Sequence, residues 1–169
     1  GITLMACFTF GLDHDTPEVF MQTARFAIEA GIDLPRYAIV TPFPNTGLYK
    51  RLEAEGRILT KNWELYDGQH VVFQPKLMTP EALYAGHEKA WKHTYSASAM
   101  ATRYLKARIQ TPVWWVANMG YRFYANHLKD FYNCDWFIGQ RDAEPVINPV
   151  YAPASAAAIP ADRDNAPCG

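Results

Sequence analysis

Two short apolar runs, separated by a segment with helical periodicity, constrain the fold of this chain more than any other feature. Residues 2–10 (ITLMACFTF) and 32–41 (IDLPRYAIVT) are rich in β-branched and aromatic residues, which predicts buried β-strands. The segment between them carries an apolar stripe at helical spacing, formed by Val19, Phe20, Ala24, Ala27 and Ile28. Because a helical crossover favours parallel strands, the first sixty residues predict an α/β fold.

Local signals place the ends of the two helices that follow these strands. The first helix is expected to begin at Asp15 or Thr16, whose side chains can cap exposed backbone amides, with Pro17 at the first helical position. The second strand ends in the stretch TPFPNTGLYKRLEAEG, residues 41–56. Its two prolines predict a turn, and a helix is expected from Asn45 or Thr46 onward. The turn carries no side chain with obvious catalytic chemistry.

Residues 61–140 predict a mainly helical extension. Thr79 followed by Pro80 predicts the start of a long helix, with Leu83, His87, Trp91 and Tyr95 repeating every four residues. Pro112 opens another helix, and a short β-like run is expected at 71–73. Residues 141–169 are rich in Ala, Pro, Asp and Asn, so we expect them to form a disordered tail.

Charge and composition exclude several classes of partner. The chain has 16 basic and 17 acidic residues without a block of like charge, which argues against nucleic-acid binding and against a polybasic membrane patch. The helix at 112–131 is too polar to span a bilayer. Cys7, Cys134 and Cys168 are too far apart to form a metal motif and indicate reduced thiols in a cytoplasmic protein. The chain begins without methionine or a secretory signal, so we expect it to be a piece of a longer protein.

Two motifs lie at the ends of the predicted strands: FTFGLDHDTPE at residues 8–18 and TPFPNTGLYKRLEAEGRI at residues 41–58. Together they resemble the last two barrel strands of radical S-adenosylmethionine (SAM) enzymes, in particular the group that also carries a cobalamin-binding domain and a helical C-terminal extension. The resemblance implies the C-terminal portion of such an enzyme. Residues 1–60 would form the last two strand–helix units of a partial βα barrel, and residues 61–140 would form the extension.

The resemblance also implies a site. Active sites in βα barrels lie at the carboxyl ends of the strands. In this family these two strand ends line the adenosyl part of SAM, the first by apolar contact with adenine and the second by backbone groups. The matching residues are Phe10, Gly11, Asp15, Val40, Thr41 and Pro42. Each also has a plainer interpretation: Asp15 as a helix cap, Gly11 as a turn residue and Phe10 as part of the core.

The chain departs from the family pattern in two respects. Where the family has glycine after the second proline of T-P-x-P-G-T-x-L-Y, this chain has Asn45, which tolerates a left-handed backbone, so the turn is expected to survive. The C-x3-C-x2-C triplet that holds the [4Fe-4S] cluster is absent from these 169 residues and is expected upstream of Gly1. The cluster, SAM and possibly cobalamin would therefore act in the intact enzyme, and we assign no catalytic or metal-binding residue to this chain.

A second hypothesis is a non-catalytic helical module that binds another protein. It rests on a dense set of aromatic residues in the extension: Trp114, Trp115, Tyr121, Phe123, Tyr124, Phe131, Tyr132, Trp136 and Phe137. Such residues suit a protein–protein surface, although internal packing against the α/β portion explains them better. The sequence does not identify the substrate, which could be a small molecule or a lipid.

Overall fold

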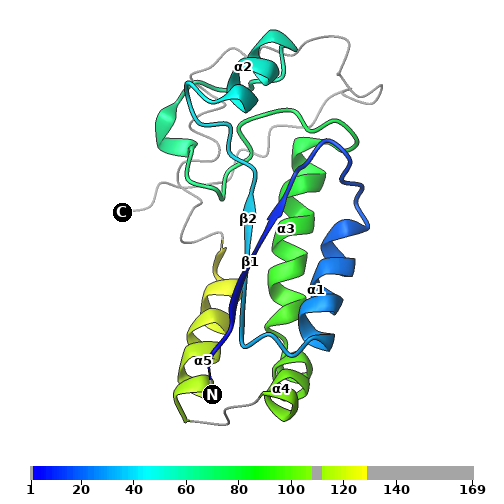
Figure 1. Cartoon of the computed structure of the whole chain (residues 1–169), viewed down its shortest axis with the longest axis vertical. Coiled ribbons are helices and arrows are strands. Elements are labelled where there is room, and N and C mark those ends of the chain that lie inside the picture. The colour runs from blue at the N-terminus through cyan, green and yellow to red at the C-terminus, as the bar shows by residue number, and fades with distance from the viewer. Residues whose placement is uncertain (1, 108–111, 129–169) are drawn as a thin grey trace, which may run out of the picture.

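The computed structural model describes residues 2–107 and 112–128 as a mixed α/β structure (Figure 1). Two strands, β1 (Met5–Phe10) and β2 (Leu34–Ile39), pair in parallel in a register that runs from Met5 opposite Leu34 to Phe10 opposite Ile39. The predicted α/β fold and the parallel pairing are confirmed, although each strand is shorter than the apolar run that predicted it. None of the helices in the described part of the chain is both long and apolar enough to cross a membrane.

The two faces of this sheet have different environments. The helix-covered face carries Ala6, Phe8, Phe10, Pro35, Tyr37 and Ile39, and the open face carries Met5, Cys7, Thr9, Leu34, Arg36 and Ala38. On the first face, the ring centroid of Phe10 lies 4.8 Å from that of Phe20, and the centroid of Tyr37 lies 5.5 Å from that of Trp91. Four of the six residues of the second face are exposed. The core therefore lies on one side of the sheet only.

Helix α1 (Val19–Glu29) buries Phe20, Ala24 and Ala27, as its periodicity predicted. Its predicted start is wrong, because Glu18 occupies the N-cap position and no side chain caps the helix. Asp15 instead turns back and accepts hydrogen bonds from the backbone amides of Gly11 and Leu12, both at 2.9 Å. Its carboxylate therefore fixes the loop after β1 rather than the helix.

Local signals located α2 (Gly47–Ala54) and α3 (Pro80–Thr94) correctly. Each begins after a threonine, Thr46 or Thr79, whose hydroxyl accepts a hydrogen bond from the amide three residues later. The four residues spaced along α3 are all buried. Asn45 has φ 65°, so asparagine adopts the left-handed conformation that glycine adopts most readily.

The remaining elements include one that was not predicted. Helix α4 (Ala97–Lys106) is separated from α3 by Tyr95 and Ser96, and the Ser96 hydroxyl accepts from the amide of Ala99. No glycine or proline announces this break. A short 3-10 helix (Trp63–Leu65) and α5 (Pro112–Asn126) complete the described elements. The run at 71–73 contributes only an isolated antiparallel bridge between Phe73 and Ile58.

A single hydrophobic core joins the first sixty residues to the extension. Leu83 and Trp91 of α3 belong to the same buried cluster as Phe10, Tyr37 and Leu52. Figure 1 shows α1 and α3 together on one side of the strands, with α2 beyond the carboxyl ends and α4 at the opposite end. The boundary at residue 60 and the barrel itself stay predictions, and the proposed tail at 141–169 lies outside the described residues.

Helices α1 and α3 approach closely at Gly86. A Cβ atom added there would collide with the ring of Phe20, a side chain that is only 2% exposed. We expect Gly86→Ala to lower the free energy of unfolding by about 2 kcal/mol, because the overlap outweighs the gain in helix propensity. Gly120→Ala in α5 is the matched control, since a Cβ there meets no atom within 4 Å. It should raise the stability by about 0.5–1 kcal/mol. Urea unfolding of both variants measures the difference, and equal effects would contradict it.

Hydrogen bonds fasten α4 and α5 to the segment that precedes β2. The Asp33 carboxylate accepts from the amide of Leu4 at 2.9 Å and from the indole N–H of Trp114 at 3.0 Å. Arg103, which is fully buried, donates to the carbonyl oxygens of Ile32, Asp33 and Thr94. Burial lowers the pKa of Arg103. We call Asp33, Arg103 and Trp114 the amino-end clasp, because they lie at the amino end of β2.

Candidate functional site

The two predicted motifs meet at the carboxyl ends of the strands. Phe10 pairs with Ile39, and the backbone amide of Val40 donates to the carbonyl oxygen of Phe10 at 2.8 Å. The loop after β1 and the turn after β2 therefore start side by side. We call this region the strand-end site and define it by the six residues predicted from the sequence.

Gly11 is required at its position for two reasons. Its φ of 97° is one that residues with side chains rarely adopt, and a Cβ atom would lie 3.0 Å from Leu83 Cδ2 and 3.1 Å from Phe73 Cζ. The two hydrogen bonds from Asp15 then hold the following amides in place. This loop is fixed by the packing of the extension as well as by its own turn chemistry.

The six residues do not all expose a side chain. Phe10 is 1% exposed and packs against Phe20 and Tyr37 on the helix-covered face, so its side chain serves the core and only its backbone lies at the strand end. Pro42 is buried as well, whereas Val40 and Thr41 are half-buried. The structure therefore places the Phe10 ring in the core, and a contact of Phe10 with adenine stays a prediction. Gly11 is buried too and its amide is bonded to Asp15, so the half-buried side chains of Asp15, Val40 and Thr41 are the groups left to contact a ligand.

A buried arginine, Arg57, links the strand-end site to the extension through hydrogen bonds. The sequence did not predict this role. Arg57 is 1% exposed and donates to Asp13 Oδ1 at 3.0 Å, to Glu55 Oε2 at 2.8 Å and to the carbonyl of Gln74 at 2.7 Å. Burial would raise the pKa of Asp13, but Arg57 and Arg51 outweigh it and lower that pKa. Asp13 and Arg57 are 44 residues apart, so no local pattern signals the contact.

The loop at 67–70 borders the same end of β2. The carbonyl oxygen of Gly68 accepts from the amide of Ile39 at 2.7 Å, so this loop runs along the edge of β2 that β1 leaves free. Asp67 accepts from the amides of Gln69 and His70 and lies 3.0 Å from His70 Nδ1. Burial alone would raise the pKa of the Asp67 carboxyl, but these hydrogen bonds outweigh that effect, so the pKa is lowered. The extension thus completes the rim of the strand-end site.

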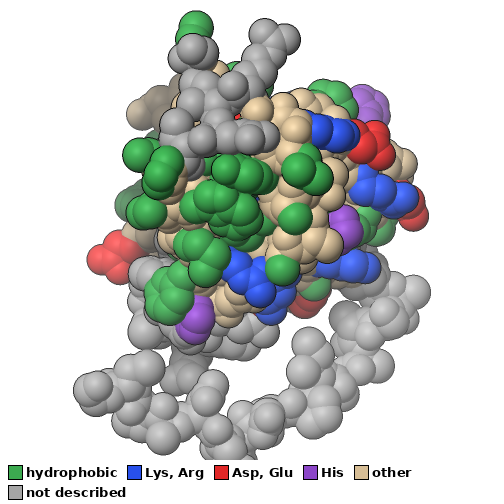
Figure 2. Space-filling view, turned by 90° about the horizontal axis from the view of Figure 1, so that it is seen from below, with side chains coloured by type: hydrophobic (Ala, Val, Ile, Leu, Met, Phe, Trp, Pro, Cys, Tyr) green, Lys and Arg blue, Asp and Glu red, His purple; other side chains and the backbone are tan. Residues whose placement is uncertain are grey.

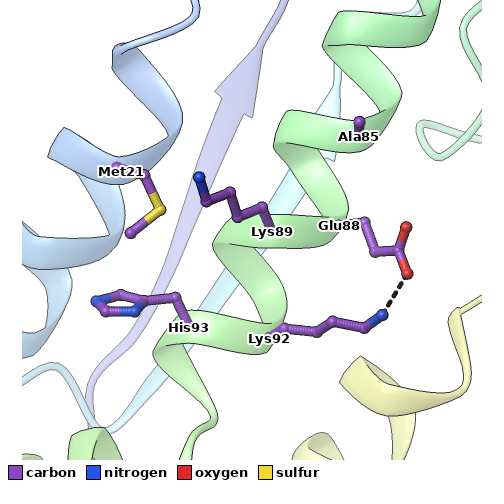
Figure 3. A pocket seen from close by; sticks show the side chains of 6 residues that line it. All are labelled: Met21, Ala85, Glu88, Lys89, Lys92 and His93. Atoms are coloured by element: carbon purple, nitrogen blue, oxygen red, sulfur yellow. Dashed lines mark hydrogen bonds and ion pairs between the residues drawn. The ribbon is translucent and has the colours of Figure 1, made fainter.

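No cluster-binding site accompanies the strand-end site within the described part of the chain. In residues 2–107 and 112–128 no group of three His, Cys, Asp or Glu side chains could hold a metal ion, and Cys7 is exposed. A hollow of about 410 Å³ lies instead between α1 and α3 (Figure 3). Lys89 and His93 point toward α1 in this hollow, whereas Lys92 pairs with Glu88 at 2.5 Å. None of the six predicted residues lines it.

The aromatic residues of α5 divide between core and surface. Trp114 is buried, and Tyr121 and Tyr124 pack against the core around Trp91. The opposite side of α5 exposes an apolar stripe: Val113, Trp115, Val116, Met119 and Phe123. Figure 2, which views the molecule from the end where α4 lies, shows hydrophobic side chains gathered on this surface. The four aromatic residues from Phe131 to Phe137 lie outside the described residues.

Comparison with known proteins places the chain in a family. Residues 46–144, more than half of the chain, match a domain of unknown function, DUF4070. The chain belongs to the DUF4070 family. The matched range begins at Thr46, the cap of α2, and includes all of α3, α4 and α5. The DUF4070 region therefore contains α3, which packs against the two-stranded sheet, whereas α1 on the same face lies outside the matched range.

Curated relatives of this DUF4070 protein include three methyltransferases. A bacteriochlorophyllide d C-12(1)-methyltransferase of Chlorobaculum tepidum is 29% identical over 131 residues, which cover 78% of this chain and 28% of the relative. An uncharacterized methyltransferase of Pyrococcus horikoshii is 30% identical over 95 residues, 56% of this chain and 21% of the relative. A bacteriochlorophyllide d C-8(2)-methyltransferase of C. tepidum is 29% identical over 80 residues, 47% of this chain and 18% of the relative.

These matches confirm the resemblance drawn from the two motifs. The DUF4070 chain is related to radical SAM enzymes of the cobalamin-binding group and so belongs to an enzyme family. The chain spans less than a third of the length of each relative described above. No solved structure matches it.

Proposed function

We propose that this chain forms one wall of the active site of a radical SAM enzyme, where it lines the adenosine of SAM and the substrate side of the cavity. The observation that carries the proposal is the adjacency of the two strand-end motifs, joined by the hydrogen bond from Val40 to Phe10. In this proposal β1 and β2 are the last two strands of a partial βα barrel, and their open face borders its interior. Cobalamin dependence and a cytoplasmic location belong to the same proposal.

The described residues suit the adenosine of SAM but could not hold the iron–sulfur cluster. Their donor set cannot hold a [4Fe-4S] cluster, because no three metal-ligating side chains come together among them. The strand-end site suits an adenosine better, since it offers half-buried Val40 and Thr41 beside the backbone of Gly11. The cluster, as electron donor, and SAM would together supply the one-electron chemistry that activates a substrate C–H bond. The part of this chain in that chemistry is to position the cofactor and exclude water.

Preorganisation explains how side chains without reactive groups contribute. Asp15 fixes the amides of Gly11 and Leu12, and Pro42 restricts the backbone at the start of the turn. Thr46 accepts from the amide of Tyr49 and donates to the carbonyl oxygen of Phe43 at 2.7 Å, which closes the turn. A ligand that binds fixed loops does not have to order them first, so its affinity is higher.

Substitution of Pro42 by alanine tests the proposed role of the turn. In the full-length enzyme we expect SAM binding to weaken by about 1 kcal/mol, since a looser turn must be ordered again on binding. Isothermal titration with SAM and a thermal melt of the same protein separate affinity from stability. Pro80→Ala is the matched control, because Pro80 is also buried but opens α3 instead. Unchanged SAM affinity in Pro42→Ala would remove the turn from the cofactor site.

The exposed stripe on α5 favours a second candidate function, a surface that binds another protein. Val113 and Val116 are each 73% exposed, and Phe123 is 57% exposed. A stripe of this kind in a soluble protein often marks an interaction site. Enzyme-family membership makes this a function beside catalysis rather than in place of it. Val116→Glu should abolish binding of such a partner without changing SAM affinity.

A further inference from the structure

Arg36 occupies a distinctive position on the open face of the sheet. It lies in the middle of β2, directly opposite Cys7 of β1, and it is the one charged residue among the strand residues of that face. On the side toward the strand end its neighbours on the face, Thr9 and Ala38, are small, whereas the larger Met5 and Leu34 lie toward the amino end. The guanidinium group is therefore exposed on a surface with room for a ligand.

Arg36 also differs from the other arginines in the described part of the chain. Arg25 and Arg122 donate to backbone carbonyls, Arg51 pairs with Asp13, and Arg57 and Arg103 are buried with several acceptors. Arg36 has neither a hydrogen bond nor an ion pair with another residue in 2–107 and 112–128. A guanidinium carries five N–H donors and remains charged. If the rest of the enzyme covers this face, the charge of Arg36 needs an anion beside it.

We propose that Arg36 binds a carboxylate group of the substrate by two parallel hydrogen bonds. The inference rests on the proposed function, in which the open face borders the interior of the active site. Guanidinium and carboxylate are both planar and match in a two-point contact, which also orients the ligand. The substrate class would therefore be a large carboxylic acid.

The position of Arg36 along the strand determines how such a substrate is oriented. Arg36 lies three positions before Ile39 at the strand end, which is a rise of about 10 Å at 3.3 Å per residue. The carboxylate would lie deep on the face while the reacting carbon lies near the strand-end site. A substrate whose acid group is remote from its reacting carbon satisfies both contacts. A flat tetrapyrrole acid has these dimensions, and two relatives are named for bacteriochlorophyllide d.

Binding of an acid and of its methyl ester to the full-length protein tests this role. The probes are bacteriochlorophyllide d, its methyl ester and SAM, each titrated into wild type, Arg36→Lys and Arg36→Gln. We expect Arg36→Gln to weaken binding of the acid about 30-fold or more and to leave the ester unchanged. Arg36→Lys should recover part of the affinity, because lysine keeps the charge but loses the two-point geometry. Arg25→Gln on α1 is the control and should bind both probes like wild type.

Several results would overturn the inference. Equal binding of the acid by wild type and Arg36→Gln would exclude the contact while leaving the proposed function intact. Loss of SAM affinity in Arg36→Gln with unchanged acid binding would assign the arginine to the cofactor instead. A wild-type protein that binds neither SAM nor the acid would overturn the proposed function together with this inference. Because the proposal places Arg36 at the wall of a ligand cavity and not in the packed core, both variants should melt near the wild-type temperature, and a large drop would indicate a structural role.

Discussion

Replacement of Asp33 by alanine is expected to lower the free energy of unfolding by about 4 kcal/mol. The carboxylate of Asp33 is the acceptor for the amide of Leu4 and the indole N–H of Trp114, and it lies close to the buried charge of Arg103. Alanine would leave two donors without an acceptor and a guanidinium without its neighbouring negative charge. Each buried donor left without an acceptor costs about 1–3 kcal/mol, and the loss of a nearby negative charge adds to this.

Urea unfolding of matched variants separates the two contributions at the amino-end clasp. Asp33→Asn keeps an acceptor oxygen but removes the charge, so its loss should be smaller than that of Asp33→Ala. Trp114→Phe removes one donor and keeps an aromatic ring, and it should cost about 1 kcal/mol. Glu29→Ala, at an exposed position, should change stability little. A loss below 1 kcal/mol for Asp33→Ala would show that the clasp does not stabilise the fold.

Acidification from pH 7 to pH 4 is expected to destabilise the protein by up to about 3 kcal/mol through His87 alone. Burial lowers the pKa of His87 to about 4, from 6.5. Its Nε2 lies 3.1 Å from the indole nitrogen of Trp91 and 3.2 Å from the carbonyl oxygen of Tyr37. Between these two pKa values the unfolded chain binds a proton that the folded protein does not. Stability therefore falls as the pH drops through 6.5 and stops falling from this cause near pH 4.

Comparison with His87→Gln isolates this effect from other titrating groups. Free energies of unfolding at pH 7, 6, 5 and 4 should fall more steeply for the wild type than for the variant. The carboxyl groups of Asp13 and Asp67, whose pKa values are lowered, lose their stabilising contribution only below about pH 4. Parallel pH profiles for the two proteins would contradict the assignment to His87.

The candidate site was predicted in outline but not in its side-chain roles. Strand ends followed by turn residues placed Phe10 and Val40 next to each other, because parallel strands carry their loops to one edge. The sequence left open whether the ring of Phe10 lies in the core, and it did not show that Asp15 bonds back to its own loop. Both depend on which face of the sheet the helices cover. The relatives support the family and leave the six ligand contacts as predictions.

The sequence by itself determined the elements whose signals are local. Hydrophobic periodicity predicted the buried faces of α1 and α3. Thr46 and Thr79 were recognisable as helix caps because a threonine hydroxyl reaches the amide three residues later. Tertiary structure alone decided the contacts between distant residues. The pairing of Asp13 with Arg57 spans 44 residues and that of Asp33 with Trp114 spans 81. Such contacts join residues that meet only in the folded chain, so no short-range sequence pattern predicts them. The position of Arg36 on the open face likewise follows from which face of the sheet the helices cover.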